Sequence, residues 1–189
     1  MLRGKAPPHL QMAQRTMPTY PVEATLRNGT RVTIRPIEPQ DAEREQAFVR
    51  GLSPESRYFR FMNTLRELSP EMLERFTHPD PSREVALVAL AGAGASAQEI
   101  GVARCALMPD GSASEFAIVV ADAFQAQGLG SLLMQALLST ARAHGIKRIE
   151  GLVLASNHRM LELMQSLGFG IASAADDPTL RRVVKELVP

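Results

Sequence analysis

In the second half of the chain, a short apolar stretch leads through a glycine-containing loop into a long amphipathic segment. Residues 114–120 have the composition of a β-strand, and the apolar residues from Leu129 to Thr140 recur at the three- and four-residue spacing of one helical face. Gly128 and Gly130 flank the point where this helix begins. A helix N-terminus presents unpaired N–H groups and a partial positive charge, and glycine lets a phosphate oxygen approach the backbone. The join is therefore a candidate pyrophosphate site, although a tight turn that needs glycine only for its geometry would leave the same pattern.

Two familiar nucleotide-binding patterns do not match this loop. No Gly-Lys-Ser/Thr follows the glycines, as a Walker P-loop requires. Leu133 stands where the dinucleotide-binding fingerprint has its third glycine. The loop therefore has to be interpreted together with the elements around it.

The whole pattern predicts an α/β (α+β) domain with a mixed sheet. The expected strands cover residues 22–26, 32–36, 83–91, 99–108, 114–120, 147–154 and 180–187. The expected helices cover residues 41–50, 54–62, 70–77, 129–144 and 157–167. Asn28-Gly29 between the first two strands predicts a hairpin with a type I′ turn. Ser53 and Ser69 each precede a proline and an acid, which is typical of a helix N-terminus.

Length and charge limit the organisation of the chain. Its 189 residues accommodate one domain, expected over residues 21–189. The first twenty residues hold bases and no acid, and we expect them to form a flexible basic leader over residues 1–20. The remaining body is slightly acidic, so no nucleic-acid surface is expected.

Composition also excludes several classes of site. Cys105 is the single cysteine, and the four histidines show no metal-ligand spacing, so no metal is expected. The longest apolar run is too short to span a bilayer, and no secretory signal is apparent. The chain is therefore expected to be cytoplasmic, with no membrane partner.

Two motifs resemble those of the GNAT superfamily of N-acetyltransferases. Residues 125–130, Gln-x-x-Gly-x-Gly after an apolar strand, resemble its motif A. Residues 157–169, Asn-x-x-Met followed by Gly-Phe, resemble its motif B. The order of elements matches from about residue 30 to residue 188, and the N-terminal half resembles the GNAT domain of bacterial protein lysine acetyltransferases.

The resemblance implies a GNAT fold, in which a mostly antiparallel sheet is flanked by helices and two central parallel strands splay apart. It implies acetyl-CoA, or another acyl-CoA, as the donor, with pantetheine between strands 114–120 and 148–154. The implied donor-binding residues are Ile118, Val119 and Val120 beside pantetheine, Gln125, Ala126, Gln127, Gly128, Leu129, Gly130 and Ser131 around the pyrophosphate, and Asn157 near the end of the second strand. Asn157 has an alternative role as a helix N-cap. Gln127 stands where a basic residue is common in the family, which removes one phosphate contact.

Glu115 is the candidate general base. A lysine amine is protonated at neutral pH, because its unperturbed pKa is about 10.4, so acetyl transfer to it requires a proton acceptor. Glu115 lies in an apolar strand, where partial burial would make its carboxylate a better base. It also resembles the strand glutamate that acts as the base in protein-acetylating members of the family. The alternative is a solvated edge residue.

No catalytic acid is assigned. Many family members have a tyrosine seven residues after the motif B asparagine, and Met164 occupies that position here. A thiolate can leave unprotonated, since thiols have a pKa of about 8.5. Cys105 could form a covalent acetyl intermediate, but a cysteine in a strand is more often inert packing.

These observations predict an enzyme that transfers an acetyl group from acetyl-CoA to a primary amine, preferably a protein lysine, by direct attack with Glu115 as the base. A polyamine, amino acid or antibiotic is the alternative acceptor, and a non-catalytic acyl-CoA sensor is the alternative function. The helices over residues 54–77 are expected to form the acceptor wall. Arg57, Arg60 and Arg66 there would either be solvated or recognise an acidic partner. Acyl-chain preference and oligomeric state stay open, with a homodimer as one alternative.

Overall fold

The computed structural model describes residues 18–187, so most of the expected leader over residues 1–20 lies outside the described residues. The strands are β1 (Val22–Thr25), β2 (Arg31–Pro36), β3 (Glu84–Ala91), β4 (Gln98–Leu107), β5 (Ser114–Val120), β6 (Arg148–Leu154), β7 (Gly170–Ser173) and β8 (Leu180–Glu186). The helices are α1 (Ala42–Gly51), α2 (Pro54–Phe61), α3 (Pro70–Thr77), α4 (Leu129–Ala143) and α5 (His158–Ser166). Every expected strand and helix is present, and β7 is additional.

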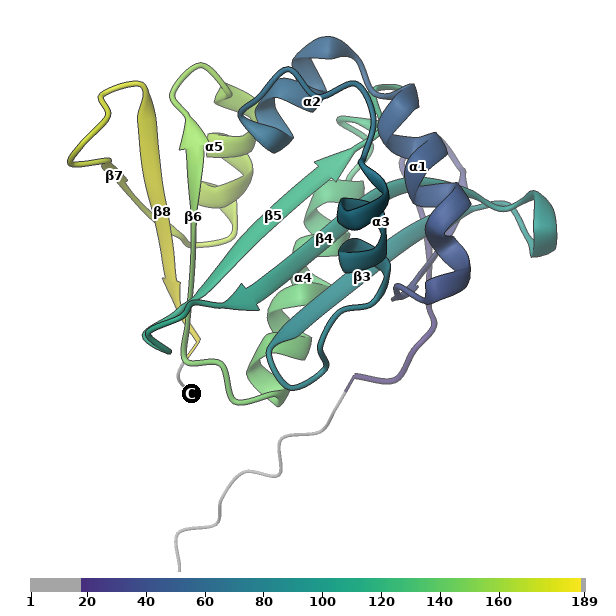
Figure 1. Ribbon diagram of the computed structural model, residues 1–189, viewed down its shortest axis with the longest axis horizontal. Coiled ribbons are helices and arrows are strands. Elements are labelled where there is room, and N and C mark those ends of the chain that lie inside the picture. The colour runs from purple at the N-terminus through teal and green to yellow at the C-terminus, as the bar shows by residue number, and fades with distance from the viewer. Residues whose placement is uncertain (1–17, 188–189) are drawn as a thin grey trace, which may run out of the picture.

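One continuous sheet organises the molecule, in the strand order β1-β2-β3-β4-β5-β6-β8-β7 (Figure 1). Neighbouring strands are antiparallel except β5 and β6, which are parallel. Helices α1, α2 and α3 lie on one face of the sheet, and α4 and α5 lie on the other (Figure 1). The expected mixed, mostly antiparallel sheet is therefore confirmed. Within residues 18–187, no helix combines the length and apolar character that a membrane crossing needs.

The β1–β2 hairpin is confirmed, but its predicted turn type is wrong. Only Gly29 has a positive φ, of +84°, whereas a type I′ turn also needs one at Asn28. The Gly29 N–H donates to the Leu26 carbonyl at 2.9 Å, and the Thr30 N–H donates to the Asn28 side chain at 3.0 Å. The Leu26 N–H also donates to the Thr30 carbonyl at 2.9 Å, so the hairpin closes through a longer loop in which Gly29 is the left-handed residue.

Local sequence determines two helix starts as expected. The Ser53 hydroxyl accepts from the N–H of Ser56 at 3.1 Å and begins α2, while the Ser69 hydroxyl accepts from Met72 at 3.2 Å and begins α3. Strand β7 was not predicted, because all four of its residues are exposed and show no apolar alternation.

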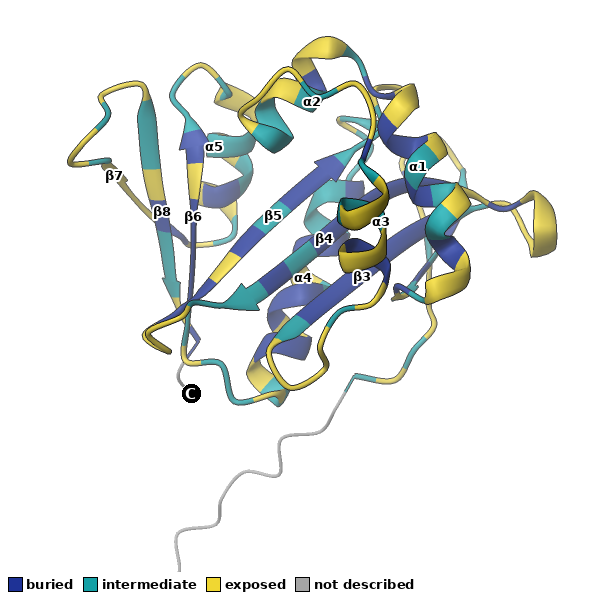
Figure 2. Cartoon of the chain, viewed as in Figure 1, coloured by how far each residue is buried: buried dark blue, intermediate teal, exposed yellow. Residues whose placement is uncertain are grey.

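Each face of the sheet has its own buried core. The α4 face is packed by an apolar cluster whose centre is Leu133, Met134 and Leu137, all fully buried. Strands β3 and β4 are buried along most of their length because helices cover both faces (Figure 2). A side chain at Gly101 of β4 would stand 2.9 Å from the Leu133 side chain, so α4 lies directly on the sheet backbone. This close contact places the start of α4 at the end of β5.

Candidate active site

Strands β5 and β6 pair at only two positions and then separate. Ser114 is opposite Ile149 and Glu115 is opposite Glu150, and no further pair follows. Beyond this point β5 remains paired with β4, and β6 with β8, so the two parallel strands diverge as a V (Figure 1). The backbone edge of β5 that faces β6 is thereby left open to a ligand. The splayed pair of strands predicted from the sequence is present.

A cleft of about 860 Å³ lies at these diverging ends. It is lined by most of the predicted donor-binding residues, namely Ile118, Val119, Val120, Gln125, Ala126, Gly128, Gly130, Ser131 and Asn157. Two predicted residues do not line it. The Leu129 side chain is fully buried in the core, and the Gln127 carbonyl accepts a backbone hydrogen bond from Arg27.

The first turn of α4 suits an anion. Gly128 is the N-cap residue, with φ of +92°, and no side chain caps the helix. The leading N–H groups of the helix are thus available, and a side chain added at Gly128 would meet no atom within 4 Å. At Gly130 an added side chain would stand 3.2 Å from Leu163, so this glycine lets α4 and α5 approach each other. The residues present therefore fit a pyrophosphate group.

Gln125 joins three elements around the cleft, which the sequence did not indicate. Its side-chain amide donates to the Ser56 hydroxyl of α2 at 3.1 Å and to the Val120 carbonyl of β5 at 3.2 Å. Its side-chain oxygen accepts from Arg159 of α5 at 3.1 Å. These contacts span separations of up to 69 residues, which local pattern analysis cannot detect.

Asp122 ties the same loop to the start of α2. It accepts from the Ser53 N–H at 2.9 Å, from the Ser53 hydroxyl at 2.7 Å and from the Ser56 hydroxyl at 2.8 Å. Partial burial acts against ionisation, but these hydrogen bonds outweigh it and lower the pKa of Asp122. The loop over residues 121–131, which we name the donor loop after its predicted ligand, is therefore held to α2 by a carboxylate that stays charged.

Asn157 combines the two interpretations that the sequence left open. Its side chain accepts from the Met160 N–H at 3.2 Å and caps α5, so the N-cap alternative is confirmed. The same residue also lines the cleft. One asparagine thus fixes the start of α5 and faces the ligand space.

Glu115 is exposed, so the expected partial burial is wrong. Its side chain alternates with buried Phe116 along β5 and points to the open part of the α1–α3 face. The facing residue of β6, Glu150, is nearly buried, and it is neutralised by Arg182 at 2.8 Å and by Arg148 at 3.2 Å. Glu115 itself stays accessible at the point where the strands begin to separate.

Arg60 connects Glu115 with the cleft. Its guanidinium lies 4.8 Å from the Phe61 ring and 5.9 Å from the Phe76 ring, and the residue lines the cleft from α2. Burial is the main cause that lowers the pKa of Arg60 to about 10, followed by the charge of Arg104, while the carboxylate of Glu115 is near enough to act in the opposite direction.

The other two arginines of the expected acceptor wall differ from Arg60. Arg57 is held by the Leu52 carbonyl at 2.5 Å, and Arg66 is exposed. The interpretation of all three as one solvated face is therefore wrong for Arg60.

Met164 and Cys105 are both buried, which agrees with packing roles for these two residues. Met164, at the position of the family's tyrosine, is fully buried in the apolar core. Cys105 is also buried, and burial raises the pKa of its thiol to about 12. A thiol with that pKa is a poor nucleophile, which agrees with the packing role.

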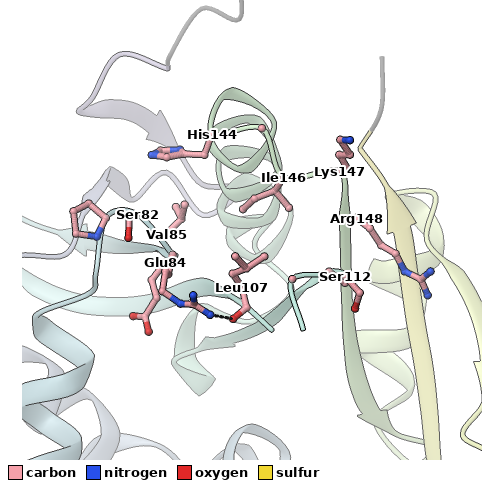
Figure 3. Close-up of a pocket in the computed structure, with 14 residues that line it drawn as sticks. Ser82, Glu84, Val85, Leu107, Ser112, His144, Ile146, Lys147 and Arg148 are labelled. Atoms are coloured by element: carbon pink, nitrogen blue, oxygen red, sulfur yellow. Dashed lines mark hydrogen bonds between the residues drawn. The ribbon is translucent and has the colours of Figure 1, made fainter. Parts of the chain in front are cut away.

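A second pocket, of about 420 Å³, lies at the other end of α4 (Figure 3). It is formed by the start of β3, the β4–β5 turn and the segment from His144 to Arg148. None of the predicted donor-binding residues lines it. Within residues 18–187, no group of three or more side chains is arranged to hold a metal ion.

The geometry of the cleft agrees with comparisons to known proteins. The family model described as "Acetyltransferase (GNAT) family" matches residues 55–169. The chain belongs to the GNAT acetyltransferase family. GNAT acetyltransferases use acetyl-CoA as the acyl donor, so the family assignment supplies a ligand class for a cleft of this shape.

Individual relatives extend the GNAT assignment over most of the chain. Acetyltransferase PA5475 of Pseudomonas aeruginosa is 35% identical over 155 residues, which cover 82% of this chain and 83% of that protein. Acetyltransferase Pat of Mycolicibacterium smegmatis is 31% identical over 152 residues, and these cover 78% of this chain but only 44% of that longer protein. Among solved structures, the GNAT domain of S. lividans PAT superposes with a TM-score of 0.79 at 28% identity, covering 88% of this chain and 96% of that one.

Proposed function

We propose that this GNAT acetyltransferase transfers the acetyl group of acetyl-CoA to a primary amine, with a protein lysine as the preferred acceptor. The observation that carries the proposal is the splayed β5–β6 pair, whose cleft is lined by the motif A and motif B residues. Residues 21–189 would then form a single acetyltransferase domain, which agrees with a sheet that is continuous from β1 to β8.

Different residues of the cleft would bind different parts of acetyl-CoA. The open backbone edge at Ile118 and Val120 would pair with the amide groups of pantetheine. The first-turn N–H groups of α4 would receive the pyrophosphate, with Gly128 leaving room for its approach. Asn157 would contact the ligand from the end of β6. The donor would supply a thioester carbonyl, the electrophile of the reaction.

Glu115 would act as the general base on the acceptor side. Its carboxylate, alone or through a water molecule, would take a proton from the acceptor ammonium so that the neutral nitrogen can attack. As the amide bond forms and the thioester bond breaks, the departing thiolate would leave without a protein acid, because Met164 is buried in the core.

The exposure of Glu115 supports a macromolecular acceptor. A base on an open sheet face can be reached by a lysine side chain that projects from another protein, whereas small substrates are usually enclosed. The resemblance of the N-terminal half to lysine acetyltransferase domains points the same way. A small amine and a non-catalytic acyl-CoA sensor remain the alternatives that the experiments below separate.

Glu115→Gln tests the proposed base. Because general base catalysis contributes about 10²- to 10⁴-fold to rates, we expect kcat to fall by at least about a hundredfold. Acetyl-CoA binding, measured by calorimetry, should change by less than about twofold, since Glu115 does not line the cleft. Glu23→Gln, in the exposed edge strand β1, is the matched control and should keep full activity. An equal loss of binding and turnover in Glu115→Gln would instead assign Glu115 a structural role.

The acceptor class requires a separate measurement. Radiolabelled acetyl-CoA and purified enzyme should label discrete proteins in a cell extract, and Glu115→Gln should label none. Labelling of polyamines or amino acids but of no protein would identify a small-amine enzyme. Binding of acetyl-CoA with no turnover on either class would identify a sensor.

A further inference from the structure

The donor loop contains no positive charge of its own. Between residues 121 and 131 the only charged residue is Asp122. Its carboxylate accepts hydrogen bonds from Ser53 and Ser56. A pyrophosphate bound only by backbone N–H groups would have no positively charged side chain to balance its own negative charge. The structure therefore raises the question of which element supplies the cation.

The β1–β2 hairpin reaches this loop from the far edge of the sheet. The backbone N–H of Arg27, in the hairpin turn, donates to the carbonyl of Gln127 at 3.2 Å. This bond joins residues one hundred positions apart, and it places the backbone of Arg27 beside Gln127. Arg27 is exposed and lines the cleft together with Gly128 and Ser131.

The guanidinium of Arg27 is free to donate hydrogen bonds to a ligand. Across residues 18–187, no hydrogen bond or ion pair engages its side chain. Arg159, the cation on the opposite side of the loop, is by contrast already bonded to the Gln125 side chain at 3.1 Å. Arg27 thus combines a backbone tether to the donor loop with an unengaged planar cation.

We propose that the Arg27 guanidinium binds the pyrophosphate of the acyl-CoA donor and supplies the positive charge that residues 121–131 lack. The inference rests on the proposed function and assigns a donor contact to an element outside motifs A and B. Arginine suits the role because its planar fork can donate two parallel hydrogen bonds to phosphate oxygens. The tether is a backbone bond, so a substitution at Arg27 removes the guanidinium while keeping the N–H that holds the hairpin to the loop.

Calorimetric titration with acetyl-CoA tests this assignment. We expect Arg27→Ala to raise Kd about tenfold, as the loss of a charge-assisted contact in a partly exposed site should. The difference should shrink in high salt, because salt screens exposed charges. Arg27→Lys should recover part of the affinity, since it restores the charge without the fork. Arg31→Ala, at the other end of the hairpin turn and outside the cleft lining, is the matched control and should bind as the parent does.

Shortened donors distinguish the pyrophosphate from other parts of the ligand. With 3′-dephospho-acetyl-CoA, which keeps the pyrophosphate, Arg27→Ala should show the same fold loss. With acetyl-pantetheine, which has no phosphate, parent and variant should bind equally. A loss that vanishes with the dephospho compound, or persists with acetyl-pantetheine, would overturn the assignment.

The inference and the proposed function fail in different ways. If the parent binds acetyl-CoA and Arg27→Ala binds within twofold of it, only the Arg27 assignment is wrong. If the parent itself shows no binding at millimolar acetyl-CoA, the donor assignment is wrong. The thermal midpoint of Arg27→Ala without ligand should match that of the parent, which shows that the hairpin is still in place.

Discussion

The two faces of the sheet are stabilised by different physical means. On the α4–α5 face, the core consists of apolar side chains such as Leu133, Met134 and Leu137. The α1–α3 face also has an apolar core, but the buried carboxyl groups of Asp41, Glu45 and Glu99 lie beside it, together with the partly buried Arg60 and Arg104. The contrast is that the face carrying Glu115 buries carboxyl groups beside its apolar core, whereas the core under α4 is built from apolar side chains.

Two buried carboxyl groups on the α1–α3 face differ in their hydrogen-bond and charge partners. Asp41 accepts two hydrogen bonds from Arg35, both at 2.7 Å, and one from Arg44 at 3.0 Å. Glu99 is buried beside Glu45, and neither of its oxygens accepts a hydrogen bond from a donor group within residues 18–187. Burial, together with the negative charges of Glu45 and Asp41, raises the pKa of Glu99 well above its ordinary value of 4.5, against the opposing charge of Arg104. One acid is therefore paired and the other is expected to keep its proton.

The largest expected effect is on the apolar face. Leu137→Ala should lower the free energy of unfolding by about 3 kcal/mol, because it leaves a cavity in a core that has no access to solvent. Chemical denaturation at pH 5 and pH 8 should give the same loss, since no titrating group is involved. Leu152→Ala, at an exposed position of β6, is the control and should change stability by less than about 0.5 kcal/mol. A loss in Leu137→Ala that depends on pH would contradict the contrast between the faces.

Glu99→Gln should change the free energy of unfolding by an amount that depends on pH, unlike Leu137→Ala. Between pH 4.5 and the raised pKa of Glu99, the folded protein keeps a proton that the unfolded chain releases, so the stability of the parent falls as pH rises. Gln does not titrate, and the advantage of the variant should therefore grow above pH 4.5 by up to about 1.4 kcal/mol per pH unit. Urea unfolding from pH 4 to pH 8 measures this. Parallel curves for variant and parent would show that Glu99 ionises normally in the folded state.

The smallest expected effects are on stability and acetyl-CoA binding when the N-cap serines of α2 and α3 are replaced. Ser53→Ala and Ser69→Ala should each cost about 1 kcal/mol of stability, the usual loss of a serine N-cap. Only Ser53 also donates to Asp122 in the donor loop, at 2.7 Å, whereas Ser69 donates to Glu71 of its own helix. Ser53→Ala should therefore weaken acetyl-CoA binding about twofold to threefold, and Ser69→Ala should leave it unchanged. Equal binding by the two variants would mean that the Asp122 tie does not shape the loop.

Features with a local physical cause were predictable from the sequence. The caps at Ser53 and Ser69, the amphipathic period of α4 and the glycine at position 128 each act within one turn of chain. The motif spacing then placed the cleft, because it specified which strand ends would diverge. Most of the residues predicted to bind the donor line this cleft, because a motif preserves backbone position.

Features that depend on distant contacts were missed. Glu115 is exposed because α2 and α3 leave its part of the sheet uncovered. The apolar sequence of the strand does not indicate which part of the sheet the helices cover. The bonds of Gln125 and the burial of Arg60 arise from packing between separate elements. The edge strand β7 has no buried face and hence no apolar pattern to detect.

The amino-acid order was sufficient to specify the elements, their caps and the glycine loop, since each follows from interactions between near neighbours in the chain. Long-range packing decided which face Glu115 occupies, how the donor loop is tied to α2, and that Arg27 lies beside Gln127 across one hundred residues. The physical reason is that side-chain burial and charge pairing depend on surfaces that exist only after the sheet has assembled.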